Sequence, residues 1–175
     1  RSAHLGRLDS ISVRTATEAA RSEGAELPEL PPCVETSAAG RPDRPRGIRF
    51  GSIVHGVLEW VPFDADIDVE PFVRQQARLL GGDERDVAAG IEAVRAAIDH
   101  PLLRRAAASS DCRREATFVH QANERSFVEG TIDLVFREDA PAEDGAMRER
   151  WIVVEFKTGR GDDETQRRYG IQLGI

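Results

Sequence analysis

Residues 151–160, Trp-Ile-Val-Val-Glu-Phe-Lys-Thr-Gly-Arg, are the stretch that decides the fold of this chain. The first seven are rich in β-branched and aromatic side chains, which is typical of a buried β-strand. Glu155 and Lys157 interrupt that composition, and the period of two along a strand places both on one face. The opposite face carries Ile152, Val154 and Phe156. Because a charged pair is costly to bury, the pattern predicts that something at the end of this strand compensates it.

Lys157 is the single lysine of the chain, and the other 23 of the 24 basic residues are arginine. Lysine supplies what arginine does not, a compact ammonium group whose pKa the surroundings can tune. The sequence therefore indicates a chemical role for Lys157. The alternative is a structural ion pair with Glu155.

Composition limits the other possibilities. A length of 175 residues suits one domain with an extension, and the net charge of −7 gives no global basic field for nucleic acid. Cys33 and Cys112 are too few and too far apart for a zinc or iron–sulfur motif. No apolar run approaches the roughly 18 residues of a membrane span, and no signal peptide is visible. We expect a cytoplasmic protein and, since the chain begins at Arg1, a piece of a longer one.

The chain divides near residue 48. Residues 1–47 are short of large apolar groups and include a segment dense in proline, glycine and charge, which indicates a flexible or extended linker. Residues 48–175 form the expected domain. Its first helix, over 48–61, has one apolar stripe made of Phe50, Ile53, Val54, Val57, Leu58 and Val61.

His55 falls just beside this stripe, between Gly51 and Glu59 on the helical wheel. Its position leaves open a surface histidine or a functional one. Two further helices are predicted over 68–80, with Asp68 as N-cap, and over 83–99. His100, beside Pro101, is expected to be a capping or loop residue before a short turn at 102–107.

Two strands follow, over 113–121 and 126–136, joined by a turn at 123–125. Asp133 is a lone acid in the second strand, and an exposed position on a half-solvated strand is the alternative to a functional role. An acidic loop is expected over 140–148. A helix beginning at 162 would then close the chain, with Tyr169 and Gln172 one turn apart.

Asp133 and the Glu155–Lys157 pair thus fall on adjacent strands. Carboxylate oxygens are the ligands that Mg²⁺ prefers, and a bound metal stabilises charge on a scissile phosphate and lowers the pKa of water. A nearby lysine can orient or deprotonate that water. The constellation is typical of metal-dependent phosphodiester hydrolysis.

The sequence resembles nuclease domains of the PD-(D/E)xK superfamily, in the RecB-like branch found at the C-terminus of RecB and AddA helicase-nucleases and related UvrD/Rep-type helicases. Five pieces carry the resemblance in family order: a helix with a metal-binding histidine, a Glu-x-x-Phe strand, a Gly-x-(Ile/Val)-Asp strand, an (Asp/Glu)-x-Lys-Thr strand and a closing Tyr-x-x-Gln-Leu helix. In this chain they are residues 51–55, 115–118, 130–135, 154–159 and 169–173. The second acid departs from the commoner aspartate of this branch, since it is Glu155.

The resemblance implies an α/β fold with a restriction-endonuclease-like core, a small mixed sheet flanked by helices. It implies Mg²⁺, replaceable by Mn²⁺, held by His55, Asp133, Glu155 and the backbone carbonyl of Phe156, with Lys157, Glu155 and Asp133 as the catalytic set. Residues expected to support these groups or to contact DNA are Glu115, Thr158, Arg160, Tyr169 and Gln172.

The function implied is Mg²⁺-dependent DNA cleavage, as an exonuclease, within an ATP-dependent helicase-nuclease of double-strand-break repair and recombination. The implied partners are DNA, covalently linked helicase domains and a partner subunit. The chain has no Gly-x-x-x-x-Gly-Lys-(Ser/Thr) loop, so this segment is not the motor. The alternative is an inactive nuclease fold that only binds DNA or braces a helicase.

Overall fold

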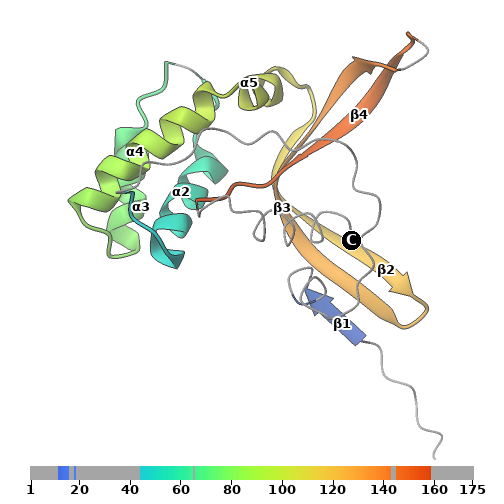
Figure 1. Cartoon of the computed structure of the whole chain (residues 1–175), viewed down its shortest axis with the longest axis horizontal. Coiled ribbons are helices and arrows are strands. Elements are labelled where there is room, and N and C mark those ends of the chain that lie inside the picture. The colour runs from blue at the N-terminus through green and yellow to red at the C-terminus, as the bar shows by residue number, and fades with distance from the viewer. Residues whose placement is uncertain (1–11, 16–17, 19–43, 65, 143–144, 159–175) are drawn as a thin grey trace, which may run out of the picture. The chain divides into compact units, whose positions relative to one another are not determined.

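The structure, a computed structural model, describes residues 12–15, 18, 44–64, 66–142 and 145–158. Within these ranges it is a mixed α/β protein with four helices and four strands (Figure 1). The helices are α2 (Ile48–Trp60), α3 (Glu70–Leu79), α4 (Glu84–Asp99) and α5 (Pro101–Ala108). The strands are β1 (Ser12–Thr15), β2 (Cys112–Asn123), β3 (Ser126–Pro141) and β4 (Met147–Val154). None of these helices has the length and apolar character required to cross a bilayer.

The strands form one mixed sheet. Its order is β1-β3-β2, and β4 also pairs with β3. β1 is parallel to β3, with Ser12 opposite Ser126, whereas β4 is antiparallel to β3, with Leu134 opposite Val154. The sequence did not predict β1, which lies inside the segment expected to be a linker, because four exposed residues are too few to show a strand pattern.

The described chain falls into two compact units. One contains α2 to α5 and β4, together with β2 up to residue 116 and β3 from residue 132 onward. The other contains β1 with residues 117–131 of β2 and β3. The described residues of the candidate site all belong to the first unit.

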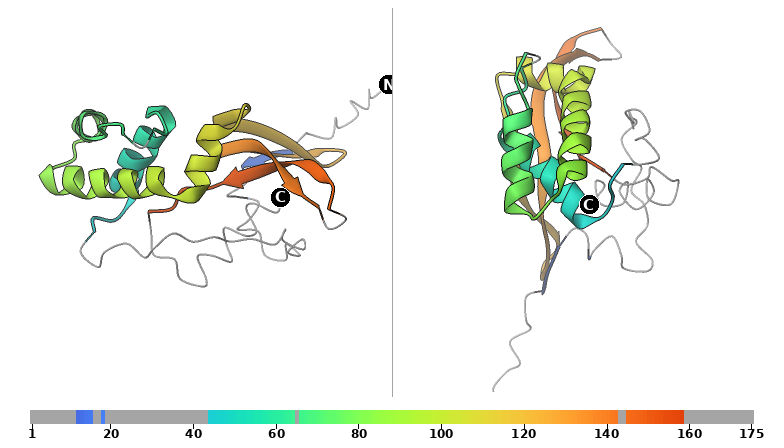
Figure 2. Two further views of the ribbon diagram at one scale, coloured as in Figure 1. Left: turned by 90° about the horizontal axis from the view of Figure 1, so that it is seen from above. Right: turned by 90° about the vertical axis from the view of Figure 1, so that its left-hand side faces the viewer.

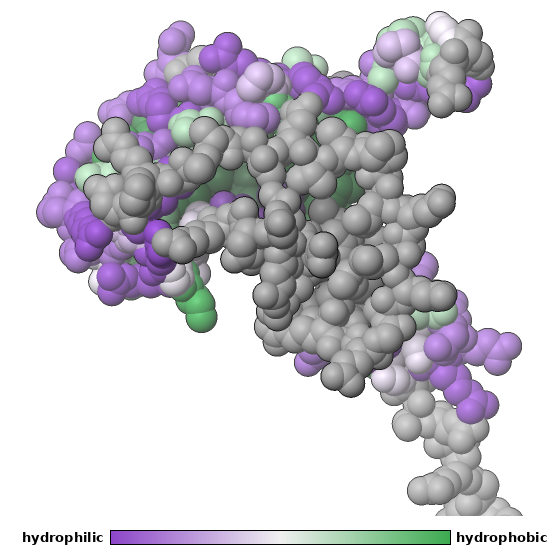
Figure 3. Space-filling view, in the orientation of Figure 1, coloured by the Kyte–Doolittle hydropathy of each residue, from purple (hydrophilic) through white to green (hydrophobic). Residues whose placement is uncertain are grey.

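The core of the first unit forms where the predicted helical stripes meet the sheet. All six residues of the α2 stripe are buried, as predicted, and Val87, Val94 and Ile98 of α4 are buried with them. Leu134, Phe136 and Val154 add the sheet's contribution to the same cluster. Figure 2 shows α2, α3 and α4 gathered together, and in Figure 3 hydrophilic side chains predominate over the helices.

The helix ends confirm the capping role expected of His100 but not the one expected of Asp68, because Val69 is the N-cap of α3. Asp83 begins α4 with a reciprocal capping box, in which its side chain accepts from the Asp86 N–H and Asp86 accepts from the Asp83 N–H. Asp68 accepts from the Glu70 N–H, one residue before the cap position of α3. His100 Nδ1 accepts from the Leu102 N–H at 3.1 Å. That contact begins α5, a helix where only a short turn was expected.

Two predictions about the strands were wrong. β3 and β4 continue as a hairpin to the pair Pro141–Met147, so both ends of the acidic loop expected over 140–148, residues 140–141 and 147–148, are strand. In addition, the strand expected to reach Lys157 ends at Val154. Cross-strand contacts explain the longer hairpin, since Arg150 of β4 donates to Glu138 of β3 at 2.6 and 2.8 Å. The sequence shows that this segment is charged, but it does not show which charged residues will pair across two strands.

Glu138 also accepts two hydrogen bonds from Arg105 of α5, at 2.7 and 2.9 Å. The side chain of Glu138 is only 18% exposed. Hydrogen bonds from Arg105, with those from Arg150, lower the pKa of Glu138 from 4.5 to about 2. Glu138 therefore links α5 to both strands of the hairpin.

Replacing Glu138 with glutamine should lower the free energy of unfolding by about 2 kcal/mol at pH 7, the scale of charged hydrogen bonds. Because the folded pKa is depressed, this stabilisation is present above pH 4.5 and is lost as the pH falls toward 2. Denaturant unfolding of parent and variant at several pH values measures the difference. Glu149→Gln, which removes an exposed partner of Arg137, is the control and should change stability by less than about 0.5 kcal/mol. A difference between Glu138→Gln and the parent that stays constant down to pH 2 would contradict this account.

Candidate active site

The candidate site begins where β4 ends. The N–H of Phe156 donates to Asp133 Oδ2 at 2.6 Å, so it is bonded to a side chain of β3. This contact is the physical reason why the ladder stops at Val154. Beyond it, Lys157 Nζ is hydrogen-bonded to Glu155 Oε1, so the two charged residues of the deciding stretch do meet.

Asp133 is the centre of the site. Its side chain is 12% exposed, which excludes the solvated position that the sequence left open. While Oδ2 accepts from Phe156, Oδ1 lies 3.5 Å from Nδ1 of His55. The structure thus brings a residue of α2, a residue of β3 and the segment after β4 to one place.

His55 lies at the border of the α2 stripe, as its wheel position predicted, and its side chain is 31% exposed. The edge of its ring meets Phe156, with ring centroids 6.0 Å apart and planes at 85°. One turn earlier, a Cβ on Gly51 would lie 3.2 Å from Thr158 Oγ1. A glycine at position 51 therefore lets the chain after β4 pass close beside this helix.

The electrostatics of the site are dominated by its carboxylates. Burial raises the pKa of Glu155, as does the negative charge of Asp133, while Lys157 opposes the shift. Glu115 of β2 is an exposed residue, but partial desolvation of its carboxylate raises its pKa, and the charges of Asp133, Glu59 and Glu155 add to that rise. The pKa of His55 is raised chiefly by its hydrogen bond to Asp133. A cluster with this excess of negative charge favours binding a cation.

Glu115 has a backbone φ of 48° and is the one non-glycine residue with a positive φ in the part of the chain that the structure describes. This left-handed conformation is uncommon for glutamate and costs of the order of 1 kcal/mol. Glu115 lies on the strand expected over 113–121 and is exposed. The backbone irregularity itself was not predictable.

Sequence reasoning missed Arg114, whose Nη1 donates to the carbonyls of Leu58, Glu59 and Val61 at 3.1, 3.1 and 2.6 Å. Its guanidinium also lies 3.7 Å from the ring centroid of Phe63. Arg114 therefore supplies hydrogen-bond donors to backbone carbonyls at the carboxyl end of the helix that carries His55. No sequence signal could have found it, because these acceptors are more than 50 residues away along the chain.

The donor set suits a hard divalent cation, since two carboxylates, an imidazole and the carbonyl of Phe156 come from adjoining segments. Among the described residues, however, no three His, Cys, Asp or Glu side chains converge into a ready-made metal site. Asp133 accepts from the Phe156 N–H, and Glu155 is hydrogen-bonded to Lys157. The residues fit Mg²⁺ by their chemistry, since a carboxylate that accepts one hydrogen bond still has lone pairs for a cation.

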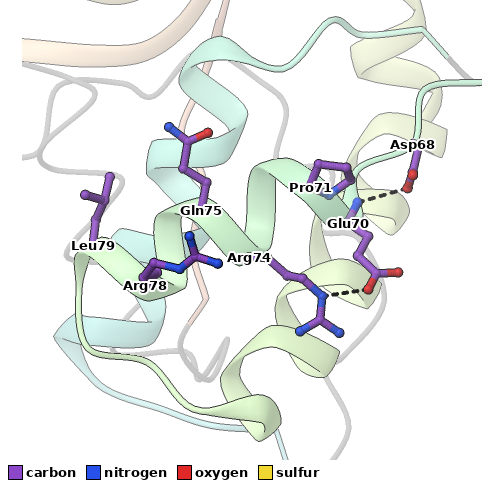
Figure 4. Close-up of a pocket in the computed structure, with 7 residues that line it drawn as sticks. All are labelled: Asp68, Glu70, Pro71, Arg74, Gln75, Arg78 and Leu79. Carbon is purple, nitrogen blue, oxygen red and sulfur yellow. Dashed lines mark hydrogen bonds and ion pairs between the residues drawn. The ribbon is translucent and has the colours of Figure 1, made fainter.

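Three predicted site residues, Arg160, Tyr169 and Gln172, lie outside the described residues. Thr158 is described and half-buried beside Gly51. A separate cavity of about 650 Å³ runs along α3 (Figure 4). None of the predicted site residues lines it; the lining residues are Asp68, Glu70, Pro71, Arg74, Gln75, Arg78 and Leu79.

Comparison of the sequence with models of known protein families gives no match, and comparison with curated proteins gives none either. The family assignment therefore stays a prediction drawn from the five motifs. The coarser conclusion, a mixed α/β protein in its described part, follows from the structure itself.

Proposed function

We propose that this chain is a Mg²⁺-dependent DNA nuclease of the PD-(D/E)xK, RecB-like type, working within an ATP-driven helicase-nuclease of double-strand-break repair. The observation that carries the proposal is that Asp133 contacts both His55 and the N–H of Phe156, the residue between Glu155 and Lys157. These residues are spread over about 100 residues of sequence. An accidental motif would have no reason to gather at one end of β4. The order of a helix followed by three antiparallel strands is also compatible with a restriction-endonuclease-like core.

In this proposal Asp133, Glu155, His55 and the carbonyl of Phe156 hold the cation. When bound, Mg²⁺ supplies charge stabilisation at the scissile phosphate and acidifies water. Lys157, kept near the carboxylates by Glu155, donates to a phosphate oxygen or to the attacking water. Burial of Asp133 and the packing of Phe156 against His55 exclude part of the solvent and fix these groups.

A second function is favoured by one observation, the absence of three converging metal ligands among the described residues. An inactive nuclease fold that binds DNA, or braces a helicase, would retain the fold without assembling the metal site. Such a module would bind DNA equally well with and without Mg²⁺ and would not cut it.

The test is incubation of the full chain with linear and circular DNA, single- and double-stranded, in Mg²⁺, Mn²⁺ or EDTA. We expect cleavage of linear DNA in either metal and none in EDTA, and degradation of linear but not circular DNA identifies an exonuclease. Asp99→Asn, an exposed acid on α4, serves as a control for charge and should cut normally. DNA that is bound but never cut in Mg²⁺ or Mn²⁺ would favour the binding module.

A further inference from the structure

The outward face of β4 carries apolar side chains in a row that leads to the candidate site. Trp151 and Val153 are 50% and 45% exposed, and the period of two puts them on one face of β4. On β3, Arg137 lies opposite Trp151 and Val135 opposite Val153. Leu134 and Val154 are the last pair of this ladder, and Asp133 and Glu155 adjoin them directly in sequence, so the row and the site are continuous. We call Trp151, Val153, Arg113 and Arg137 the β4 platform.

Two arginines accompany Trp151. The guanidinium of Arg113 lies 5.5 Å from the centroid of the indole ring, a cation–π contact. Arg113 also donates to Asp111 at 3.0 and 3.2 Å, and Arg137 to Glu149 at 3.0 Å. These ion pairs are solvent-accessible, and such pairs contribute little to stability. Both guanidinium groups can therefore exchange a carboxylate partner for a phosphate without a large loss of protein stability.

We propose that the β4 platform binds a single-stranded stretch of the nucleic acid beside the bond to be cut, with a base stacked on Trp151 and phosphates held by Arg113 and Arg137. This proposal rests on the proposed function. Exposed aromatic side chains flanked by arginine are the elements that bind single strands without reading sequence. The net charge of −7 provides no long-range attraction, so binding must come from such local contacts.

The spacing also fits. Glu155 lies four positions beyond Trp151, a span of about 13 Å for extended chain at roughly 3.3 Å per residue. A base on Trp151 would thus lie a few nucleotides from the scissile phosphate. Paired bases within a duplex do not expose their faces to a side chain, so the platform should prefer single-stranded DNA.

The chain has two tryptophans, Trp60 on α2 and Trp151, which allows a direct optical test. Each is replaced in turn by phenylalanine, and a single-stranded oligodeoxythymidylate is added in EDTA so that no cutting occurs. We expect saturable quenching of emission in Trp60→Phe, where Trp151 remains, and unchanged emission in Trp151→Phe. Trp151→Ala should weaken binding about 10-fold, the scale of one stacked base. Trp60→Ala, which removes a residue that is 74% exposed, is the matched control.

Thermal unfolding of each variant checks that a loss of binding is not a loss of fold, and Trp151→Phe should restore the affinity that Trp151→Ala loses. Binding without quenching of Trp151, or equal affinity in Trp151→Ala, would overturn the platform while leaving the nuclease intact. Quenching without cleavage in Mg²⁺ would support the platform and overturn the nuclease. Self-association that Trp151→Ala abolishes, with no quenching, would make this face a protein contact and overturn the proposal.

Discussion

Replacing Asp133 with asparagine should reduce DNA cleavage by at least about 1,000-fold, a loss of roughly 4 kcal/mol of transition-state stabilisation. The substitution removes the negative charge needed to hold the cation. It keeps a side-chain oxygen that can accept the Phe156 N–H, so the end of β4 should remain in place. Single-turnover cleavage at saturating Mg²⁺ measures the rate, and calorimetry measures binding of the metal.

Asp139→Asn is the matched control, because it removes an exposed carboxylate from the same strand, β3. That variant should cut at the parental rate and bind the metal normally. If Asp133→Asn also cut normally, or if the parent protein bound no divalent ion, the proposed metal site would be wrong. Unfolding curves for both variants separate a lost charge from a lost fold.

Replacing Lys157 with arginine should slow cleavage at least about 100-fold, the effect of one positioned acid–base or electrostatic group. The positive charge is retained, so a purely structural ion pair with Glu155 would survive the change. A guanidinium is larger, planar and always protonated, and it cannot take the place of a compact ammonium beside the attacking water. DNA and metal binding should stay within a few-fold of the parent.

The comparison for Lys157→Arg is Arg104→Lys, the reverse exchange at an exposed ion pair on α5, which should leave the rate unchanged. Single-turnover rates and binding constants are measured for both variants over the same range of pH. A near-parental rate in Lys157→Arg would assign this lysine to a structural ion pair with Glu155 and leave catalysis to the metal alone.

Much of the helical part was predictable from the sequence, because its information is local. The stripe of α2 from Phe50 to Val61, the capping role of His100 and the end of α3 near Leu80 all depend on residues within a few positions of one another. The border position of His55 followed from the same periodicity. Short strands were less predictable, and β1 is the example, since its pairing with β3 depends on a partner more than 100 residues away.

The sequence by itself determined which residues could form a site: a lone acid in β3, a Glu-x-Lys at the end of β4 and a histidine beside an apolar stripe. Only the tertiary structure decided how they meet, with Asp133 between His55 and the Phe156 N–H, and with β4 ending because of that bond. The tertiary structure also decided that Arg114 lies at the end of α2 and that Trp151 lies on an exposed face of the sheet. The physical reason is that local periodicity selects the face of an element, whereas contacts between elements depend on packing and register across distant parts of the chain.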